Sequence, residues 1–583
     1  MIRYFYKILK PVIYTAISLI FIPVITNAQI LPEMKYPKDY FQWPLALKPE
    51  IVANFGELRP NHFHMGFDCR TNLKQNMPVL AAAEGYIARV KIEPFGFGRC
   101  IYINHPNGYT SLYAHLNDFF PELEKYVAQQ QYLQKSWKVF LDIPANLFPV
   151  SKGQFIAGSG STGGSEGPHL HFEIRETKTD KVLNPSLFGF AIPDDIAPDV
   201  NKLALYDRNL STYEQTPKLF NLKKIKGVYG TLPDLLTINS DKVSFGINAF
   251  DRCTASANRN GIFEALLYDN ENAVLGFQFN KIGYEETRYL NGHIDYKLRS
   301  NGGPFVEHLS RLPGYANDIY KMISGNGVIN IADDNIHRIK IEVSDANGNT
   351  SIVQFKIRRD TNLVKKTDSA ISSPYQQKEF YPGFINIFES KKIGFYLPEK
   401  CLYDSFRFQY KEIIPKTGNT IYQIHNINVP LQTAFPLKMK GNIPPSLKNK
   451  VVIERFWNAK SDFEKAVPVS VSNEEWFVAS FREFGNFQLQ VDTIPPTITP
   501  MGFKDNMNTA KLNRLAFVVT DNSKGLKNFS ATLDGKWLRF SNDKGKTFIY
   551  IFDAMCQPGL HELILNVEDI VGNSTEKIYH FIR

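Results

Sequence analysis

The sequence predicts a mostly β chain with several domains. Short runs rich in Val, Ile, Phe and Tyr alternate with Gly, Asn, Asp and Pro turns, and long helical periodicity is scarce. The chain has 583 residues, several times the usual length of one domain. We therefore expect an N-terminal antiparallel β-sheet domain with a small helical insertion, followed by two or three β-sandwich domains.

The N-terminal 28 residues have the layout of a secretory signal peptide. Three basic residues precede an uncharged apolar run, and Thr26–Ala28 suits cleavage before Gln29. The run is short for a bilayer span and Pro23 interrupts it, so an uncleaved anchor is the less favoured alternative. We expect an exported protein, periplasmic or otherwise associated with the cell envelope.

Charge and cysteine content argue against several classes of protein. The formal net charge is +9, and the lysines and arginines are scattered, so no nucleic-acid partner is expected. The five cysteines are an odd number without paired spacing, so the sequence indicates neither a disulfide framework nor a cysteine-based metal motif.

One segment of the first domain, about residues 29–190, departs from the β pattern. In the run FPELEKYVAQQQYLQKSW, from Phe120 to Trp137, apolar residues recur near helical spacing, among them Leu123, Val127 and Leu133. The spacing predicts a helical insertion at about 119–150.

A weak internal repeat marks the later domains. The pattern V-x-D-x-x-G-N-[ST]-[ST] begins at Val343 and again at Val567, and it predicts a strand, a glycine turn and a closing strand. This resembles the last hairpin of bacterial immunoglobulin-like sandwiches. Proline-stiffened linkers precede both segments, so we expect such sandwiches at about 195–360 and 495–583, with a further β-rich domain at 370–491.

Histidines concentrate in the first domain, where six of the twelve fall between positions 62 and 171. On an extended strand, His64 and Asp68 would face the same side. In the run HLHFEI, His169, His171 and Glu173 would share one face, while the intervening apolar residues would pack on the other. Two such strands could build one site.

A fourth candidate histidine follows a predicted hairpin. Asn107-Gly108 is a strong tight-turn signal and would place Tyr113 and His115 on one face of the returning strand. A hydrolytic zinc site takes three ligands from His and carboxylate and keeps one open position, which His64, Asp68 and His171 would supply. His115 and His169 would then remain for proton transfer and charge stabilisation.

Together these motifs resemble the lysostaphin-type, or LytM-like, metallopeptidase family, whose HxGxD, YxHL and HLHFE motifs occur here in order. The resemblance covers roughly residues 50–185. It implies one Zn²⁺ per chain bound by His64, Asp68 and His171, with His115 and His169 as the catalytic pair. The segment from 119 to 150 is longer than the family's usual connection, so we expect it to form a wall or a lid of the substrate groove.

Several alternatives stay open at this level. His62 lies two residues from His64, and only the Gly and Asp spacing favours His64 as a ligand. Glu173 could be a further participant, although a solvent-facing or supporting position is favoured. We expect Cys69, beside Asp68, to point to the opposite face and to pack in the core.

The function that these expectations favour is a zinc endopeptidase that hydrolyses the peptide cross-links of bacterial peptidoglycan. The favoured bond joins D-alanine to diaminopimelate, which makes a DD-endopeptidase. The alternative is a non-cleaving peptidoglycan-binding regulator or amidase activator. Peptidoglycan stem or cross-link peptides are the expected partners, and the C-terminal sandwiches could contact other cell-envelope proteins.

Overall fold

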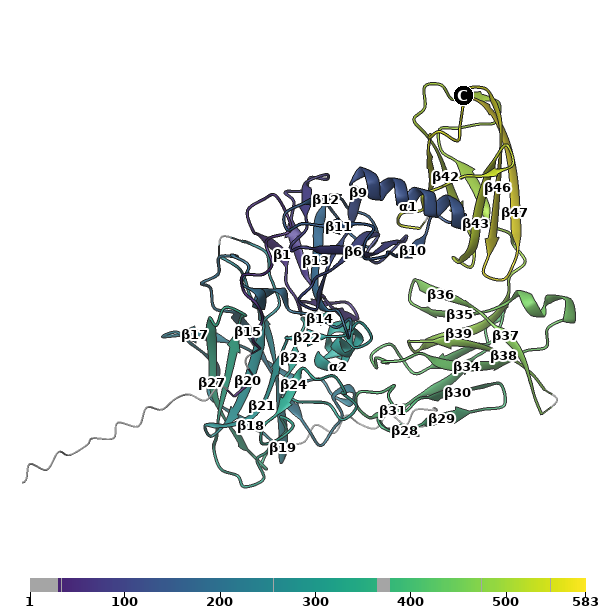
Figure 1. Cartoon of the computed structure of the whole chain (residues 1–583). Helices are drawn as coiled ribbons and strands as arrows, with labels where there is room; N and C mark the ends of the chain where they lie inside the picture. Colours follow the sequence, from purple (N-terminus) through teal and green to yellow (C-terminus); the bar gives the residue numbers. More distant parts are fainter. Residues whose placement is uncertain (1–29, 33, 255, 364–377, 473, 546) are drawn as a thin grey trace, which may run out of the picture. The chain divides into compact units, whose positions relative to one another are not determined.

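The computed structural model describes residues 30–32, 34–254, 256–363, 378–472, 474–545 and 547–583. Strands dominate these residues and helices are few, so the predicted mostly β class is confirmed (Figure 1). The expected signal peptide at 1–28 lies outside the described residues. Within the ranges above, no helix is long and apolar enough to cross a membrane.

The N-terminal domain is built on one large, mainly antiparallel sheet. In order of hydrogen-bonded neighbours its main path is β1 (Ile51–Ala53), β4 (Phe67–Arg70), β13 (His169–Glu176), β8 (Tyr109–Ala114), β7 (Arg99–Asn104), β6 (Gly85–Ile92) and β10 (Val139–Asp142). Short strands join it at the side: β11 (Pro149–Val150), β14 (Val182–Leu183) and β22 (Lys281–Ile282). Two smaller sheets complete the domain: β5 (Pro78–Leu80), β12 (Phe155–Ser159) and β9 (Leu116–Phe119), and the pair β2 (Leu58–Arg59) and β3 (His62–Phe63).

Strand β13 shows why this sheet has one polar face. Its alternation places Leu170, Phe172 and Ile174 in the domain core, where each is fully buried. The intervening His169, His171 and Glu173 therefore lie on the other face, as the sequence predicts. The predicted hairpin between β7 and β8 is also present, and Gly108 in its turn has φ +85°.

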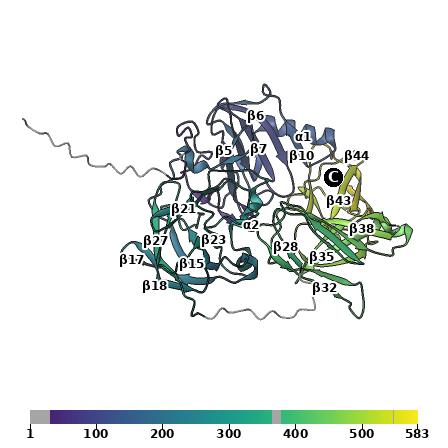
Figure 2. The same cartoon turned by 90° about the horizontal axis from the view of Figure 1, so that it is seen from below.

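The helical insertion is confirmed as α1 (Pro121–Gln134), which begins with proline in its first turn and ends at the left-handed Lys135. Leu123 and Val127 are fully buried against the core of the N-terminal domain. Leu133 is 76% exposed, so the apolar residues that recur near helical spacing do not all lie on the buried face. Both views show α1 running beside β10 (Figure 1, Figure 2).

The next segment forms two sheets around one core. The first contains β16 (Lys218–Asn221), β15 (Asp199–Asp207), β19 (Lys242–Phe250), β23 (Glu307–His308) and β25 (Ile329–Asn330). The second contains β17 (Lys223–Ile225), β18 (Val228–Ile238), β27 (Thr350–Arg359), β26 (His337–Ser344), β20 (Glu264–Asp269), β21 (Asn272–Gln278) and β24 (Tyr320–Met322). Short helices accompany them: α2 (Leu290–His293), α3 (Tyr296–Ser300), and the 3-10 turns Pro185–Phe188, Thr212–Glu214 and Thr287–Tyr289.

The core of this segment extends into the N-terminal domain. Phe63 and Met65 from the N-terminal domain are buried in the same apolar cluster as its strands, and β22 pairs with β14 across the expected boundary. The buried apolar surface is therefore continuous between the first two parts of the chain.

Two further β-sandwiches follow. The third part contains β28 (Lys378–Phe380), β31 (Phe406–Phe408), β29 (Asn386–Glu389), β30 (Ile393–Leu397), β34 (Phe435–Lys440), β38 (Glu474–Phe481), β37 (Val467–Val471), β32 (Tyr410–Ile413), β33 (Ile421–Ile424), β39 (Gly485–Val491), β35 (Val451–Trp457) and β36 (Lys460–Lys465), with a 3-10 turn at Pro445–Lys450. The fourth contains β40 (Thr497–Pro500), β42 (Arg514–Thr520), β45 (Thr547–Ile551), β41 (Met507–Asn508), β47 (Ser574–Ile582), β46 (Leu560–Asp569), β43 (Leu526–Leu533) and β44 (Lys536–Trp537).

The repeated sequence motif has the same structure in both copies. It forms the hairpin β26–β27 in the second part and β46–β47 in the fourth, and the turn glycines Gly348 and Gly572 have φ +91° and +86°. A positive φ is the conformation that glycine adopts without a steric penalty. The predicted strand, turn and strand are confirmed in each copy.

Candidate metal centre

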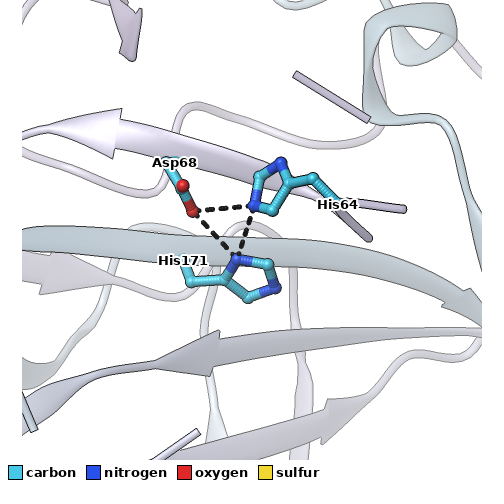
Figure 3. A group of neighbouring side chains, drawn as sticks. All are labelled: His64, Asp68 and His171. Atoms are coloured by element: carbon cyan, nitrogen blue, oxygen red, sulfur yellow. Dashed lines mark hydrogen bonds and ion pairs between the residues drawn. The ribbon is translucent and has the colours of Figure 1, made fainter. Parts of the chain in front are cut away.

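Three side chains of the N-terminal domain converge on one point (Figure 3). His64 Nε2 lies 2.9 Å from Asp68 Oδ1 and 3.1 Å from His171 Nδ1, and His171 Nδ1 lies 3.0 Å from Asp68 Oδ1. The three residues are 6 to 7% exposed. The structure therefore brings together the three residues that the sequence selects as metal ligands.

The backbone reaches this arrangement by a route that differs from the prediction. His64, Met65 and Gly66 lie between β3 and β4, so the expectation of one extended strand from His64 to Asp68 is wrong. Gly66 passes so close to β13 that an added Cβ would lie 2.4 Å from the carbonyl oxygen of Phe172. Only glycine allows this approach. Asp68 then pairs in register with His171 across β4 and β13.

The second nitrogen of each histidine fixes which ring atom faces the cluster. His64 Nδ1 lies 2.7 Å from the carbonyl oxygen of Asn54, which can only accept a hydrogen bond. His171 Nε2 lies 2.9 Å from Glu173 Oε1. If both nitrogens donate, the lone pairs of His64 Nε2 and His171 Nδ1 point toward each other and toward a carboxylate oxygen. In that tautomer three acceptor atoms converge, an arrangement that a cation between them would stabilise.

Electrostatics agree with this arrangement. Burial opposes ionisation of Asp68, but the charge interaction with His64 and hydrogen-bond contacts with His64, His169 and His171 hold the pKa of Asp68 well below its usual value. Burial likewise opposes a charge on His171, but Asp68 and Glu173 raise its pKa to about 9. The protein surroundings of His171 thus favour a positive charge, which a proton or a metal ion would supply.

The donor set fits zinc. Two imidazole nitrogens and one carboxylate oxygen are the ligands that zinc takes in hydrolytic sites, where a fourth position stays open. The carboxylate behind His171 matches the usual support of a metal-bound histidine, in which the second ring nitrogen donates to an acidic group. One further charge lies close, since Arg59 donates to Asp68 Oδ2 at 3.2 Å.

The two remaining candidate histidines border the cluster. The ring centroid of His115 lies 4.8 Å from that of His169 and 5.9 Å from that of His171. His169 Nε2 lies 3.4 Å from Asp68 Oδ1. All five residues that the sequence singles out are therefore gathered at one place.

His115 reaches the site through an unusual backbone conformation. Tyr113 faces the apolar core, where its ring contacts Phe172 at 5.4 Å, so the prediction that Tyr113 and His115 share one strand face is wrong. His115 follows the end of β8 and has φ +59°, a left-handed conformation that is costly for a residue with a Cβ. This turn moves the imidazole from the core face to the cluster face.

The protonation of His115 follows from its surroundings. Burial and the nearby His171 and His169 lower its pKa to about 3, so it is neutral at ordinary pH. Its Nδ1 lies 2.8 Å from the carbonyl oxygen of Thr162 and donates to it, which leaves Nε2 as a free acceptor. His169 is oriented in the same way, because its Nδ1 lies 2.8 Å from the carbonyl oxygen of Gly167.

The structure also adds supporting residues that the sequence does not reveal. Glu173 is fully buried, so the solvent-facing alternative is wrong, and Arg175 donates to its Oε2 at 2.7 Å. The hydroxyl group of Tyr284 donates to Glu173 Oε1, the oxygen that also contacts His171. Tyr284 lies 111 residues beyond Glu173 in the sequence, and no local motif connects the two.

The remaining residues of the first motif lie outside the cluster. His62 is exposed and its Nδ1 contacts the carbonyl oxygen of Pro60 at 2.9 Å, so it is separate from the site. Cys69 is fully buried in the core on the opposite face, as the sequence predicts. Gly163 packs tightly against the loop before β7, since a Cβ at Gly163 would lie 2.3 Å from the nitrogen of Gly98.

A buried His, Asp and His set on an antiparallel sheet, with two more histidines beside it, is the kind of site that metallohydrolases use. Comparison with known protein families agrees: residues 62–137 match Peptidase family M23, and residues 379–492 match the Zu5-like domain. The chain thus carries an M23 peptidase domain of the LytM or lysostaphin type.

Several known proteins are similar to part of this chain. The chain is 28% identical over 156 residues to the cell division protein DipM of Caulobacter vibrioides, covering 27% of this chain and 21% of that protein. It is 37% identical over 112 residues to the DD-carboxypeptidase/endopeptidase Mpg of Neisseria meningitidis, covering 19% and 20%. A solved zinc-containing peptidase from Vibrio cholerae is 25% identical, covering 24% of this chain and 37% of that one with a TM-score of 0.18. The chain thus spans about a fifth of the length of these curated relatives.

Proposed function

We propose that this protein is a zinc-dependent endopeptidase that hydrolyses peptide cross-links of bacterial peptidoglycan. The observation that carries the proposal is the convergence of His64, Asp68 and His171, whose ligand atoms lie within 3.1 Å of one another. The M23 peptidase domain supports the same conclusion. Zinc bound there would supply a Lewis acid that polarises the scissile carbonyl and makes water more acidic.

His115 and His169 would do the proton chemistry. His115 Nε2 is a free acceptor on a neutral ring, so it can take the proton of the attacking water. His169 Nε2 lies 3.4 Å from Asp68 Oδ1, and the His169 ring would stabilise the negative charge that develops on the attacked carbonyl oxygen. Both rings are held by backbone carbonyls, so little reorganisation is needed during the reaction.

The favoured bond is the one between D-alanine and diaminopimelate. The name of the relative Mpg includes DD-endopeptidase activity, and 37% identity over 112 residues makes a similar specificity the simplest assignment. A glycyl-glycine endopeptidase is the competing specificity.

The remaining proposals concern location and modules. We propose that residues 1–28 direct export to the periplasm or cell envelope, where stem and cross-link peptides are the substrates. We further propose that the parts at about 195–360 and 495–583 are immunoglobulin-like, because each ends in the same glycine hairpin. Other cell-envelope proteins are candidate partners of these modules.

Digestion of purified sacculi tests the proposal. The zinc-loaded full chain should release monomeric muropeptides from directly cross-linked dimers, as identified by mass spectrometry. The matched control is His171→Ala, which removes one ligand. Cleavage of pentaglycine alone would reject the DD bond. If zinc were bound but no peptide product formed, the alternative would hold, namely a non-cleaving regulator or amidase activator.

A further inference from the structure

Two clusters of three aspartates lie outside the peptidase site. Asp194, Asp251 and Asp345 form the first, and Asp492, Asp521 and Asp569 form the second. In each cluster, one carboxylate oxygen from every residue lies within 4.8 Å of the others. Acidic clusters alone do not define a site, so the surroundings of these oxygens decide the question.

The first cluster contains buried oxygens without partners. Asp251 is 4% exposed and Asn260 is 3% exposed, yet no described residue donates a hydrogen bond to Oδ1 of either side chain. Both residues line one cavity of about 40 Å³, together with Asp194, Asp345 and Asn347. A cavity of this size has room for an ion or a water molecule. A buried, unpartnered carboxylate oxygen is costly unless a cation or a donor occupies such a space.

The charge of the first cluster is not balanced by the protein. Among the described residues, no lysine, arginine or histidine forms an ion pair with these three aspartates, and the neighbouring Arg252 pairs with Asp199 instead. Burial and the like charges of the other two carboxylates raise the pKa of Asp251 to about 7. The arrangement therefore lacks a positive partner.

The second cluster also contains buried carboxylate oxygens without partners. Asp492 is 3% exposed, and its Oδ2 accepts no hydrogen bond from any residue that the structure describes. Oδ1 of Asp521 is also buried, and no described residue donates a hydrogen bond to it. The other oxygens of the cluster are occupied by local donors, for example the amide of Asn573, which donates to Asp569 Oδ2 at 2.7 Å.

The two clusters occupy equivalent positions in their folds. Asp194 and Asp492 each lie five residues before the first strand of a sandwich, β15 or β40. Asp251 and Asp521 each follow the next strand of that sheet, β19 or β42, which pairs antiparallel with the first. Acidic residues scattered at random over the surface would not occupy the same two positions relative to the strands in two separate sandwiches.

The third aspartate completes the equivalence. Asp345 and Asp569 begin the turns of the repeated hairpins, β26–β27 and β46–β47. In each copy, the asparagine four residues later donates to the carbonyl oxygen of the linker aspartate: Asn349 to Asp194 at 3.3 Å and Asn573 to Asp492 at 3.1 Å. The segment that contains Asp194 and the segment that contains Asp492 are thus each hydrogen-bonded to their own hairpin, next to the three carboxylates.

We propose that each cluster is a Ca²⁺ site that fastens a linker to the sandwich that follows it. Calcium takes oxygen ligands at about 2.3–2.6 Å, so ligands on opposite sides of one ion lie about 5 Å apart. Carboxylate and amide oxygens line the cavity of the first cluster, although Cys253 also borders it. Among the described residues, each of the two clusters is made of aspartates alone. The occupied sites would stiffen the junctions before β15 and β40.

Calcium titration of the full chain tests this proposal. After chelation and restoration of one equivalent of zinc, calorimetry with CaCl₂ should give two sites with Kd on the order of 0.1–1 mM. Asp251→Asn and Asp521→Asn should each leave one site, and the double variant should leave none. Asp318→Asn, at an exposed position outside both clusters, is the matched control and should keep two.

Thermal unfolding separates lost binding from lost folding. Tenfold excess Ca²⁺ over Kd should raise the unfolding temperature of the wild type by about 3–6 °C and leave the double variant unchanged. Without calcium, the Asn variants should be at least as stable as the wild type, because they relieve like-charge repulsion. If either variant fails to fold, Asp194→Asn and Asp492→Asn test the same two sites from the linker side.

Three results would overturn the proposal. Absence of Ca²⁺ binding by the wild type at millimolar concentration would leave shared protons as the neutralising charge. The double variant could retain two sites, which would place the ions elsewhere. Equal binding of Mg²⁺ would contradict the assignment to calcium, because Mg²⁺ prefers a smaller octahedral site that keeps several waters.

Discussion

His64 Nε2 lies 3.1 Å from His171 Nδ1, although the two residues are 107 positions apart in the sequence. Each ring is held from behind by an acceptor, Asn54 for His64 and Glu173 for His171. Two imidazole lone pairs would repel each other at this distance unless a cation lies between them and Asp68.

Removal of any ligand should remove the metal. His64→Ala, Asp68→Ala and His171→Ala each take away one of three ligand atoms in a buried site, so zinc content should fall from about one per chain to near zero. Activity should be lost in parallel. Elemental analysis of the purified variants measures this directly. Stoichiometric zinc in all three variants would show that the ligands are other residues.

The neighbouring histidines should behave differently. His115→Ala and His169→Ala should keep zinc and lose about 10²–10⁴-fold in turnover, because both residues are assigned to proton transfer and charge stabilisation. The exposed His62→Ala is the matched control and should keep the wild-type rate. If His115→Ala or His169→Ala cleaved at the wild-type rate, the catalytic role proposed for that residue would be wrong.

Zinc affinity should depend on pH through His171. A metal ion displaces the proton from this ring, whose pKa without metal is about 9. The affinity should therefore rise about tenfold per pH unit between pH 6.5 and 9. Competition with a chelator of known affinity at several pH values measures the slope. A flat profile would mean that no proton is displaced from His171.

The same pKa predicts the stability of the metal-free protein. The folded pKa of about 9 lies above the unfolded value of about 6.5, so the protonated ring stabilises the fold fully below pH 6.5. This contribution is lost as pH rises through 9. The unfolding temperature of the metal-free protein should fall over that range, and His171→Ala should lack this component of the slope.

Much of this site could be predicted from the sequence because its spacing is local. His169, His171 and Glu173 alternate along β13, and period-two alternation is a property of any strand. The backbone around His64 and His115 could not be predicted in this way. His115 departs from the strand with φ +59°, and a close approach to Phe172 sets the path at Gly66, so tertiary contacts override the local pattern.

The contact between Tyr284 and Glu173 could not be predicted from the sequence for another reason. Tyr284 comes from a different part of the chain and acts on Glu173 through a single hydroxyl group, which leaves no periodic signal. The fold class follows from strand patterning, whereas the shared core involving Phe63 and Met65 depends on how two parts pack together. Packing between distant segments is not encoded in local periodicity.

Loss of the Glu173 carboxylate, which contacts His171 Nε2, should lower zinc affinity without removing a ligand. Glu173→Gln keeps the shape of the side chain but loses the carboxylate charge, so zinc affinity should fall about 10–100-fold. Tyr284→Phe removes only one donor to Glu173 and is the matched control, with a smaller expected loss. Chelator competition gives both affinities. An unchanged affinity for Glu173→Gln would mean that this carboxylate does not tune the ligand.

Helix α1 belongs to the segment that we expect to form either a wall of the substrate groove or a lid over it. Leu123 and Val127 are fully buried, so lifting the helix would uncover apolar core, which favours a fixed wall. Glu124 ties the helix to Arg99 of β7, and the backbone N–H of Arg99 donates to Thr162 Oγ1 at 3.0 Å. The carbonyl of Thr162 in turn orients His115.

Breaking this tie should therefore reveal the role of the helix. If α1 is a wall, Glu124→Gln should lower activity on whole sacculi more than on small peptides, because binding energy remote from the reacting bond is lost. Glu122→Gln, exposed on the same helix, is the matched control and should change neither activity. Faster cleavage of small peptides by Glu124→Gln would instead indicate a lid, since access would no longer need an opening step.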